Sequence, residues 1–579
     1  MNLSRREFLQ ILAAASAAGM SLAGCDTKSK GSATTSANDP YDIKPFGQVS
    51  FLHMTDCHAQ LLPIYFREPH INIGIGGATG KPPHLVGEHL LKAFNIATDT
   101  ADAHAFTYLN FEEASRKYGK VGGFAHLATL VKKMRAQRPN SLLLDGGDTW
   151  QGSATALWTK GQDMVDACKL LGVDIMTGHW EFTYGAERVK DLIKQMEGSI
   201  EFVAQNVVDN TFEEPIFKPY TIREMNGVKV AVIGQAFPYT PIANPRYMIP
   251  DWSFGIRDGR MQEMVDEARG NGAQVVVVVS HNGMDVDLKM ASRVNGIDAI
   301  LGGHTHDGVP APQVIPTPDG GKTLVINSGS NGKFLSVLDI EVKDGKVSDY
   351  RFKLLPVFSN LLEADKDMQA LIDKVRSPFK QDLEESLAIT ESLLYRRGNF
   401  NGSFDQLILD AMLKVQDAEI ALSPGFRWGT SLLPGDTITR ERLMDQTAIT
   451  YGTSTLNHMK GEMLKVVLED IADNLFHEDP YYQMGGDMVR IGGLKYSIDP
   501  TAKMGNRIGD LELNGKPIDP SKTYKVAGWA SMEQQPEGNP KIWDTVSEFL
   551  LDKKTVRIDE INLPKIKGMD NNPGFVRIS

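Results

Sequence analysis

From Gly47 onward, short apolar runs alternate with segments in which apolar and polar residues are mixed. The apolar runs have the length and β-branched content of buried strands, and they cover 49–54, 141–146, 173–178, 201–206, 228–234, 273–280, 297–303 and 323–329. Three segments between them have the apolar spacing of amphipathic helices, namely 123–136, 184–197 and 257–270. Continuous apolar strands separated by amphipathic helices predict an α/β fold whose sheets are buried on both faces.

The pattern changes past about residue 345, where the long apolar runs stop. A charged helix is expected at roughly 363–385, followed by an α+β region with helices around 404–416 and 459–475. A chain of 579 residues also exceeds the ~250–300 residues at which one core stops growing. We therefore predict two domains joined by a connecting segment, with bounds 45–345, 346–385 and 386–579.

The stretch 66–120 interrupts the first connection between a strand and a helix, and it is rich in Gly, Pro and His. Loops longer than ~12–15 residues are uncommon in compact domains unless they carry function. In α/β folds, ligands bind where strands end and loops begin. We therefore predict that 66–120 is a functional or family-specific insertion.

The N-terminus has the features of an export signal. Residues 4–9 read SRREFL, and the apolar run that follows is shorter than the ~20 residues of a spanning helix. The pair Arg5–Arg6 resembles a twin-arginine signal, which predicts a signal at 1–25 and a periplasmic protein; the alternative is a cytoplasmic protein with a basic N-terminus. Residues 22–25 read LAGC and resemble a lipobox, so Cys25 is either a lipid anchor or lies near a plain cleavage site. The small, polar stretch 26–44 predicts a flexible tether.

Composition narrows the class of partner. Apolar residues make up 41% and charged residues 23%, as in ordinary soluble proteins. The formal charge of −12 provides no basic surface for a phosphate backbone, so we do not expect nucleic acid as a partner. Besides Cys25, the chain has only Cys57 and Cys168, too few for a disulfide framework, and we expect both to lie in the core.

Five short motifs with chemically active side chains stand at the ends of the predicted strands. They read TDCH, DGGDTWQG, GHWEF, VSHNG and GGHTH, and they contain Asp56, His58, Asp148, His179, His281, His304 and His306. Each motif alone is weak, because a His or Asp after a strand is usually an ordinary loop residue. Together, carboxylates and imidazoles at one sheet edge would be costly to bury unless divalent cations were bound. The mixed Asp/His set suits manganese, zinc or iron better than magnesium or calcium.

With these motifs the chain resembles the calcineurin-like metallophosphoesterases, and among them the 5'-nucleotidase group. The resemblance implies an N-terminal metallophosphoesterase-like βαβ sandwich, a C-terminal α+β 5'-nucleotidase-like domain and a hydrolase with two divalent metals. It also implies a role for each candidate ligand: Asp56, His58 and His306 bind the first metal, His281 and His304 bind the second, Asp148 bridges the two, and His179 stands where the family usually has an Asn ligand.

The chain departs from the nucleotidase pattern at one motif. Nucleotidases read GNHEFD there and this chain reads GHWEFT, so Trp180 replaces the His beside the metals and Thr183 replaces its Asp partner. A His–Asp pair assists an alkoxide-type leaving group by protonating it. Its loss suggests a leaving group that needs little help, and thiols, with a pKa near ~8.5, are such groups.

Further motifs resemble the SoxB family of thiosulfohydrolases: 82–87, 103–111, 122–130, 423–439 and 484–493. This resemblance implies hydrolysis of a cysteine S-thiosulfonate on the swinging arm of the carrier protein SoxYZ, with release of sulfate. It suggests catalytic roles for Arg427 and Trp180, and substrate contacts for Arg427, Tyr481, Gly486 and Asp487. A planar guanidinium suits a sulfonate.

Several alternatives remain at this point. Arg427 is otherwise a surface residue in a turn, and Trp180 is otherwise a core aromatic that fills space. An exported 5'-nucleotidase or cyclic phosphodiesterase would share the same metal ligands. A tethered binding protein with a vestigial metal cluster is the non-enzymatic alternative.

Overall fold

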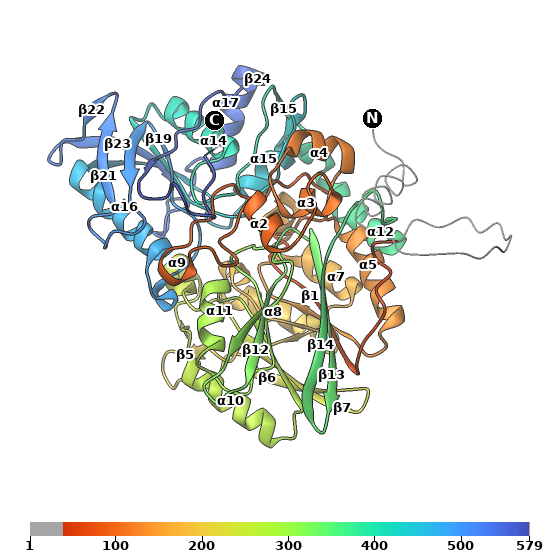
Figure 1. The fold of residues 1–579 in the computed structure, drawn as a ribbon. Coiled ribbons are helices and arrows are strands. Elements are labelled where there is room, and N and C mark those ends of the chain that lie inside the picture. Colours follow the sequence, from red (N-terminus) through yellow and green to blue (C-terminus); the bar gives the residue numbers. More distant parts are fainter. Residues whose placement is uncertain (1–38, 578–579) are drawn as a thin grey trace, which may run out of the picture.

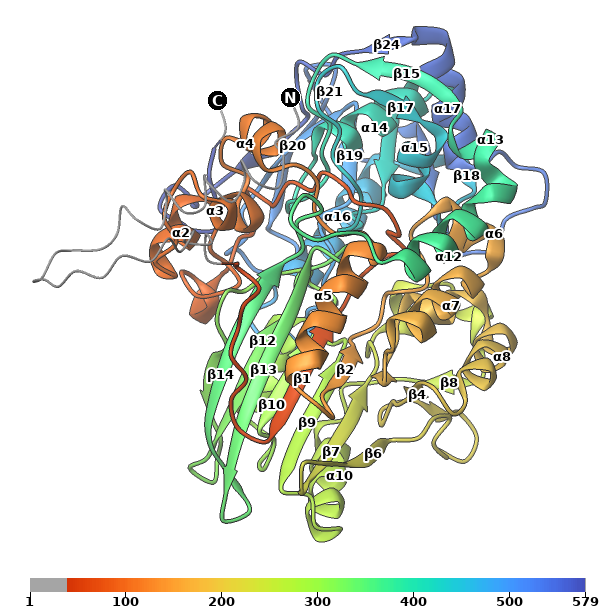
Figure 2. The ribbon, with the colours of Figure 1, turned by 90° about the vertical axis from the view of Figure 1, so that its right-hand side faces the viewer.

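The computed structural model describes residues 39–577. The predicted signal, the lipobox at Cys25 and tether residues 26–38 lie outside this range. Figures 1 and 2 show two domains, a sandwich of two sheets with helices outside it and a second domain, coloured teal to blue, at one end of the sandwich strands. None of the helices within 39–577 is long and apolar enough to cross a membrane.

The first sheet has six strands in the order β14-β13-β1-β2-β3-β4. Its members are β1 (Val49–Met54), β2 (Leu142–Asp145), β3 (Ile175–Met176), β4 (Glu201–Phe202), β13 (Phe334–Lys343) and β14 (Lys346–Pro356). Strands β1 to β4 run parallel to one another, and β13 pairs antiparallel with β1. The carboxyl ends of β1, β2 and β3 therefore lie at one edge, where loops can meet.

The second sheet also has six strands, in the order β11-β12-β10-β9-β7-β6. Its members are β6 (Tyr220–Met225), β7 (Val228–Gln235), β9 (Val275–Ser280), β10 (Ala299–Gly302), β11 (Gln313–Pro316) and β12 (Lys322–Asn327). Strands β7, β9, β10 and β12 are parallel, so the ends of β9 and β10 share an edge.

The two sheets pack face to face around one apolar cluster, which includes Phe51 from β1 and Val277 from β9. The outer face of the first sheet is covered by helices that include α5 (Phe124–Gln137), α7 (Gln162–Leu171) and α8 (Ala186–Met196). The second sheet is covered by α10 (Asp258–Gly270) and α11 (Met284–Ala291). The predicted α/β fold with sheets buried on both faces is confirmed.

The second domain is α+β, as predicted. It contains three small sheets, with strand orders β17-β15-β24, β18-β23-β16-β19 and β22-β21-β20-β25. Their strands are β15 (Ser386–Thr390), β16 (Ile420–Ser423), β17 (Thr437–Thr439), β18 (Ser454–Lys460), β19 (Arg490–Gly492), β20 (Leu494–Ile498), β21 (Ile508–Leu513), β22 (Lys516–Pro517), β23 (Thr523–Trp529), β24 (Thr555–Val556) and β25 (Lys565–Ile566). Its helices include α14 (Ser403–Val415), α15 (Arg440–Thr447), α16 (Gly461–Phe476) and α17 (Ile542–Lys553). Its loops at 424–428 and 484–487 face the carboxyl edge of the sandwich, because they share a cavity with that edge.

Two predicted bounds were wrong. Strand β14 (Lys346–Pro356) pairs along its length with β13, so the first domain extends past residue 345 and the connecting segment begins later. Strand β14 was not predicted, because one of its faces is exposed along much of the strand and its sequence alternates polar and apolar residues instead of forming an apolar run. Tyr41, within the predicted tether, is buried, and its hydroxyl donates to the carbonyl of Pro356 (2.9 Å).

The insertion 66–120 forms three short helices, α2 (Glu88–Ala93), α3 (Ala101–Phe106) and α4 (Phe111–Tyr118). Its first part bonds to the end of the chain: the amides of Asn72 and Val86 donate to the carbonyls of Gly574 (2.7 Å) and Pro573 (3.1 Å). The insertion therefore contacts both domains.

Candidate metal centre

The seven side chains predicted from the motifs converge at the carboxyl edge of the two sheets. Asp56 and His58 follow β1, Asp148 follows β2, His179 follows β3, His281 follows β9, and His304 and His306 follow β10. All but His304 are buried, and His304 is half-buried. Strand topology thus brings together residues that lie up to 250 positions apart.

The first cluster consists of Asp56, His58, Asp148 and His306, with one potential ligand atom from each within 4.8 Å of the others. Two imidazole nitrogens face one another, because His58 Nε2 lies 3.1 Å from His306 Nε2. His306 Nε2 also lies 3.2 Å from Asp56 Oδ1. Imidazole nitrogens that face one another at this distance beside carboxylates are suitable donors for a divalent cation.

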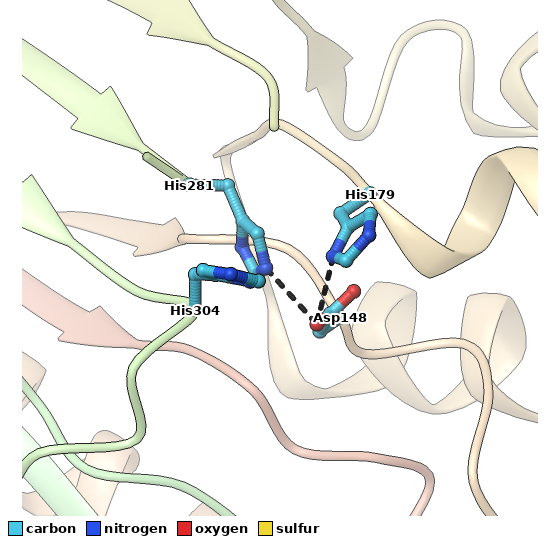
Figure 3. A group of neighbouring side chains, drawn as sticks. All are labelled: Asp148, His179, His281 and His304. Carbon is cyan, nitrogen blue, oxygen red and sulfur yellow. Dashed lines mark hydrogen bonds and ion pairs between the residues drawn. The ribbon is translucent and has the colours of Figure 1, made fainter. Parts of the chain in front are cut away.

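The second cluster consists of Asp148, His179, His281 and His304 (Figure 3). Asp148 Oδ2 lies 3.0 Å from His281 Nε2 and 3.3 Å from His179 Nδ1. Asp148 belongs to both clusters, so its carboxylate is placed where it can serve two cations at once.

Electrostatics favour the ligand form of several of these imidazoles. Burial lowers the pKa of His58 to about 3, and burial also holds the pKa of His304 and of His306 well below the usual value. A neutral imidazole is the form that binds metal. The carboxylates Asp148 and Asp56 instead raise the pKa of His281 to about 10. The donor types and their burial fit two divalent cations of the manganese, zinc or iron kind.

Backbone strain marks the same loops. Asp56, His58, Asp148, His304 and His306 all have positive φ, between 44° and 72°. Such conformations are uncommon for residues other than glycine, and they cluster at functional sites where the surroundings hold them. Five of the seven candidates carry this signature, which the sequence alone does not display.

A buried carboxylate that sequence reasoning missed supports the centre. Glu181 accepts backbone N–H bonds from His179 (2.8 Å), Thr149 (2.7 Å) and Asp148 (3.2 Å). It thus ties the loop after β2 to the loop after β3. Its place in the GHWEFT motif was the available signal.

A cavity of about 650 Å³ opens onto the second cluster from between the domains. Asp148, His179, His304 and His306 line its inner end, and the second domain lines most of the rest. Its walls include aromatic side chains: Trp180, Phe237, Phe426, Trp428 and Trp529. The last four were missed as site residues, although Phe426 and Trp428 flank Arg427 in the 423–439 motif.

The structure places Arg427 at the cavity wall, held by both domains. It donates to the carbonyls of Thr305 (3.1 Å) and Gly486 (2.5 Å), and its Nε lies 3.3 Å from Asp487 Oδ1. Gly486 and Asp487 also line the cavity. The surface-turn alternative for Arg427 is wrong, because its side chain is 11% exposed and faces the metal loops.

Tyr481 does not line the cavity with the other predicted substrate residues. Lys289 of α11 lies over its ring, with Nζ 4.1 Å from the centroid. Its backbone carbonyl accepts from the Tyr239 hydroxyl. Tyr481 thus joins the second domain to α11 rather than standing beside the two clusters.

Trp180 fits both alternatives considered above, as a residue that lines the cavity and as a core aromatic. It lines the cavity, and it also packs in the second domain's core, stacked on Tyr451 with ring centroids 5.8 Å apart. Thr183 is turned away, because its hydroxyl donates to the Trp180 carbonyl (2.8 Å) and accepts from Gln151 (2.8 Å). No acid–base pair stands at these two positions.

Both cysteines of the described residues are buried and unpaired. Burial raises the pKa of the Cys57 and Cys168 thiols well above the usual value. Neither is an activated nucleophile, as expected.

The chain is similar to known 5'-nucleotidases in sequence and in fold. The 5'-nucleotidase C-terminal domain family matches residues 389–539. Rat 5'-nucleotidase is 27% identical over 454 residues, covering 70% of this chain and 76% of that protein. A 5'-nucleotidase precursor from Thermus thermophilus has the same fold, with 21% identity, a TM-score of 0.71, and coverage of 90% of this chain and 99% of that one. The protein is a metal-dependent hydrolase of the 5'-nucleotidase superfamily.

A closer relationship distinguishes it within that class. The sulfate thiohydrolase SoxB of Thermus thermophilus, solved in complex with glycerol, is 36% identical with a TM-score of 0.87. The alignment covers 91% of this chain and 98% of that one. The chain belongs to the SoxB family.

Proposed function

We propose that the protein is a two-metal thiosulfohydrolase that cleaves a cysteine S-thiosulfonate on the carrier SoxYZ. Water adds to the terminal sulfonate sulfur, the S–S bond breaks, and sulfate leaves while a persulfide stays on the carrier cysteine. The observation that carries this proposal is the replacement of the nucleotidases' acid His by Trp180, whose side chain lines the cavity beside the metal clusters. Membership of the SoxB family supports it.

We propose one metal position with Asp56, His58 and His306, and a second with His179, His281 and His304, bridged by Asp148. Manganese is the proposed metal, with zinc and iron as alternatives. Two such ions, when bound, supply a water of lowered pKa and neutralise charge on the oxyanion. The protein's own contribution is to hold these donors in place beside a cavity with aromatic walls.

Arg427 is proposed to bind the sulfonate oxygens. Asp487 and the carbonyls of Gly486 and Thr305 fix its guanidinium plane at the cavity wall, and two of its five N–H groups are left for a ligand. Trp180 is proposed to line the path of the leaving persulfide, which departs as an anion and needs no proton donor.

Arg427→Lys tests this role. Lysine keeps the charge but loses the planar fork, so we expect catalytic efficiency to fall about 10-fold or more while both metals stay bound. Sulfate release and metal content measured on the same preparation check it. Unchanged kinetics would remove Arg427 from the site.

The cavity favours a substrate presented on an arm rather than a free small anion. Its walls are mostly apolar and aromatic over about 650 Å³, far larger than a thiosulfonate group needs. Contacts along such a wall supply binding energy only to a substrate with further atoms attached. Periplasmic location through the twin-arginine route, with or without a lipid on Cys25, is part of the same proposal.

The deciding experiment compares thiosulfonate-loaded SoxYZ with free thiosulfate as substrates for the purified, metal-loaded protein. We expect sulfate release from the loaded carrier at a catalytic efficiency at least ~10²-fold above that for thiosulfate. Equal efficiencies would overturn the carrier assignment.

A nucleotidase or cyclic phosphodiesterase remains the second candidate, because curated 5'-nucleotidases from rat and cattle are 27% and 26% identical. The double variant Trp180→His with Thr183→Asp rebuilds the nucleotidase pair. If the leaving-group argument holds, this variant gains hydrolysis of alkyl phosphomonoesters by up to ~10²-fold and gains nothing on the carrier. Strong nucleotide hydrolysis by the wild type would favour the second candidate.

A further inference from the structure

Each histidine of the metal centre has two ring nitrogens, and the partner of one decides which is free for a metal. For two of the candidates this partner is a backbone carbonyl of the first domain. His58 Nδ1 lies 3.1 Å from the Gln151 carbonyl, and His281 Nδ1 lies 2.6 Å from the Gly146 carbonyl. Both rings therefore present Nε2 to the centre.

For His304 the partner comes from the second domain. Its Nε2 lies 3.1 Å from the carbonyl of Met484. A carbonyl only accepts, so Nε2 carries the proton and Nδ1 is left for the metal. The approach requires glycine at the next position, because a Cβ on Gly485 would stand 2.4 Å from His304 Nε2.

For His179 the partner is Asn244 of the first domain, which is held in turn by Tyr451 of the second domain. Its Nε2 lies 3.1 Å from Asn244 Oδ1, and the Asn244 amide donates to the Tyr451 hydroxyl at 3.1 Å. Asn244 and Tyr451 are buried, at 2% and 7% exposure. The Tyr451 hydroxyl accepts from the amide nitrogen, and this bond leaves the Asn244 oxygen facing the ring.

We propose that the second domain sets the affinity of the second metal position, by fixing His179 and His304 in the tautomer that presents Nδ1. Asn244, Tyr451 and the Met484–Gly485 loop are the positioning residues. The tautomer of His58 at the first metal position has no such dependence, because its Nδ1 partner is the Gln151 carbonyl of the first domain, and its ring contact with Trp428 of the second domain is a stacking contact that holds neither ring nitrogen. This inference rests on the two-metal part of the proposed function.

The proposal also explains why His179 needs a hydrogen-bond partner. The nucleotidases usually have Asn at this position, and an Asn ligand has no ring nitrogen that needs a partner. The imidazole of His179 has a second nitrogen, Nε2, which is buried and needs an acceptor. Asn244 and Tyr451 supply its acceptor across the domain boundary.

The test is a Mn²⁺ titration of the full-length apoprotein, with each binding step resolved by calorimetry and by the electron paramagnetic resonance signal of coupled manganese pairs. We expect Asn244→Leu and Gly485→Ala to weaken the second step ~10–100-fold, as loss of an outer partner of a metal-ligating His does, and to leave the first step unchanged. Tyr451→Phe should weaken the second step ~2–10-fold.

Gly486→Ala is the matched control for the loop. Gly486 also has positive φ (78°), but a Cβ there meets only the Gly425 carbonyl, at 3.8 Å. It therefore introduces the same backbone strain without displacing His304, and both binding steps should keep wild-type affinities. If Gly486→Ala weakens the second step as much as Gly485→Ala, the contact with His304 is not the cause.

A double-mutant cycle separates positioning from general loosening. In a His179→Asn background the ring nitrogen is gone, so Tyr451→Phe should no longer change the second step. An equal effect in both backgrounds would overturn the proposal, as would equal weakening of both steps by Asn244→Leu. Because no substrate is present, these results stand whether or not the protein hydrolyses the loaded carrier.

Discussion

Asp145 lies at the end of β2, three residues before Asp148, and is fully buried. Its Oδ1 accepts from the Gly147 amide (3.0 Å) and the Thr149 hydroxyl (2.8 Å), whereas Oδ2 has no hydrogen-bond partner among residues 39–577. Burial, with the nearby Glu181 carboxylate, raises the pKa of Asp145 to about 8. Between about pH 4 and pH 8 the folded protein therefore holds a proton that the unfolded chain has released.

Asp145→Asn should remove this pH dependence. Because folding raises the pKa of this carboxyl group, the free energy of unfolding of the protein falls by up to about 1.4 kcal/mol for each pH unit as pH rises from ~4 to ~8. The variant, measured without metal by urea unfolding, should match wild type near pH 4 and exceed it at pH 8. Parallel stability profiles would show that Asp145 is not buried as a neutral acid.

At the level of residues, the motifs at strand ends predicted seven side chains that the structure brings together, because Asp and His at such ends are unusual in combination. Their roles as metal ligands stay predictions. Asn244 and Phe426 were missed, because an Asn after a short helix and a Phe in a loop have no distinctive pattern. Their roles arise from contacts between segments about 65 and 250 residues apart.

At the level of elements, one buried ion pair ties α5 to the first sheet. Arg138, directly after α5, donates to both oxygens of Asp339 on β13, from Nε at 2.8 Å and from Nη2 at 2.9 Å. The two side chains are 0% and 2% exposed. Neither charge is near water, so each depends on the other.

Arg138→Leu should destabilise the first domain by about 3–5 kcal/mol, because Asp339 would be left buried and unpaired. Arg135→Leu is the matched control on the same helix. Its ion pair with Asp174 is 31% and 33% exposed, so its loss should cost about 1 kcal/mol or less. Denaturant unfolding followed by circular dichroism compares the two, and equal losses would contradict the argument.

Elements were predictable where periodicity was strong. Strand β1 has the predicted bounds, and α5 and α10 lie within a residue of theirs. Strands β3 and β4 have only two residues each. The run that contains β3 turns early into the loop that carries His179. The β13–β14 hairpin was not predicted as a unit, because β14 alternates polar and apolar residues and is open on one side.

At the level of the whole molecule, the metals are expected to hold together the two sheets of the first domain and their strained loops. A cation that binds only the folded protein stabilises it by about 2.7 kcal/mol per site at 100 times its Kd. Adding Mn²⁺ to chelator-treated protein should therefore raise the thermal unfolding temperature. Asp148→Asn, which loses the shared carboxylate, should respond little, and its sulfate release should fall at least ~10²-fold.

Comparing Mn²⁺, Zn²⁺ and Fe²⁺ in this assay ranks the metals by the temperature shift at equal concentration. Manganese is expected to restore the highest activity. If wild type and Asp148→Asn respond equally, the stabilisation comes from cations bound elsewhere.

The bonds between the insertion and the end of the chain have a consequence for the order of assembly. The Asn572 side chain donates to the Gly74 carbonyl (2.8 Å) across 498 residues of sequence. A contact of this span forms only after residue 572 has been synthesised, and late closure of distant segments is slow. The insertion therefore reaches its final position late in folding, after both domains that it contacts have been made.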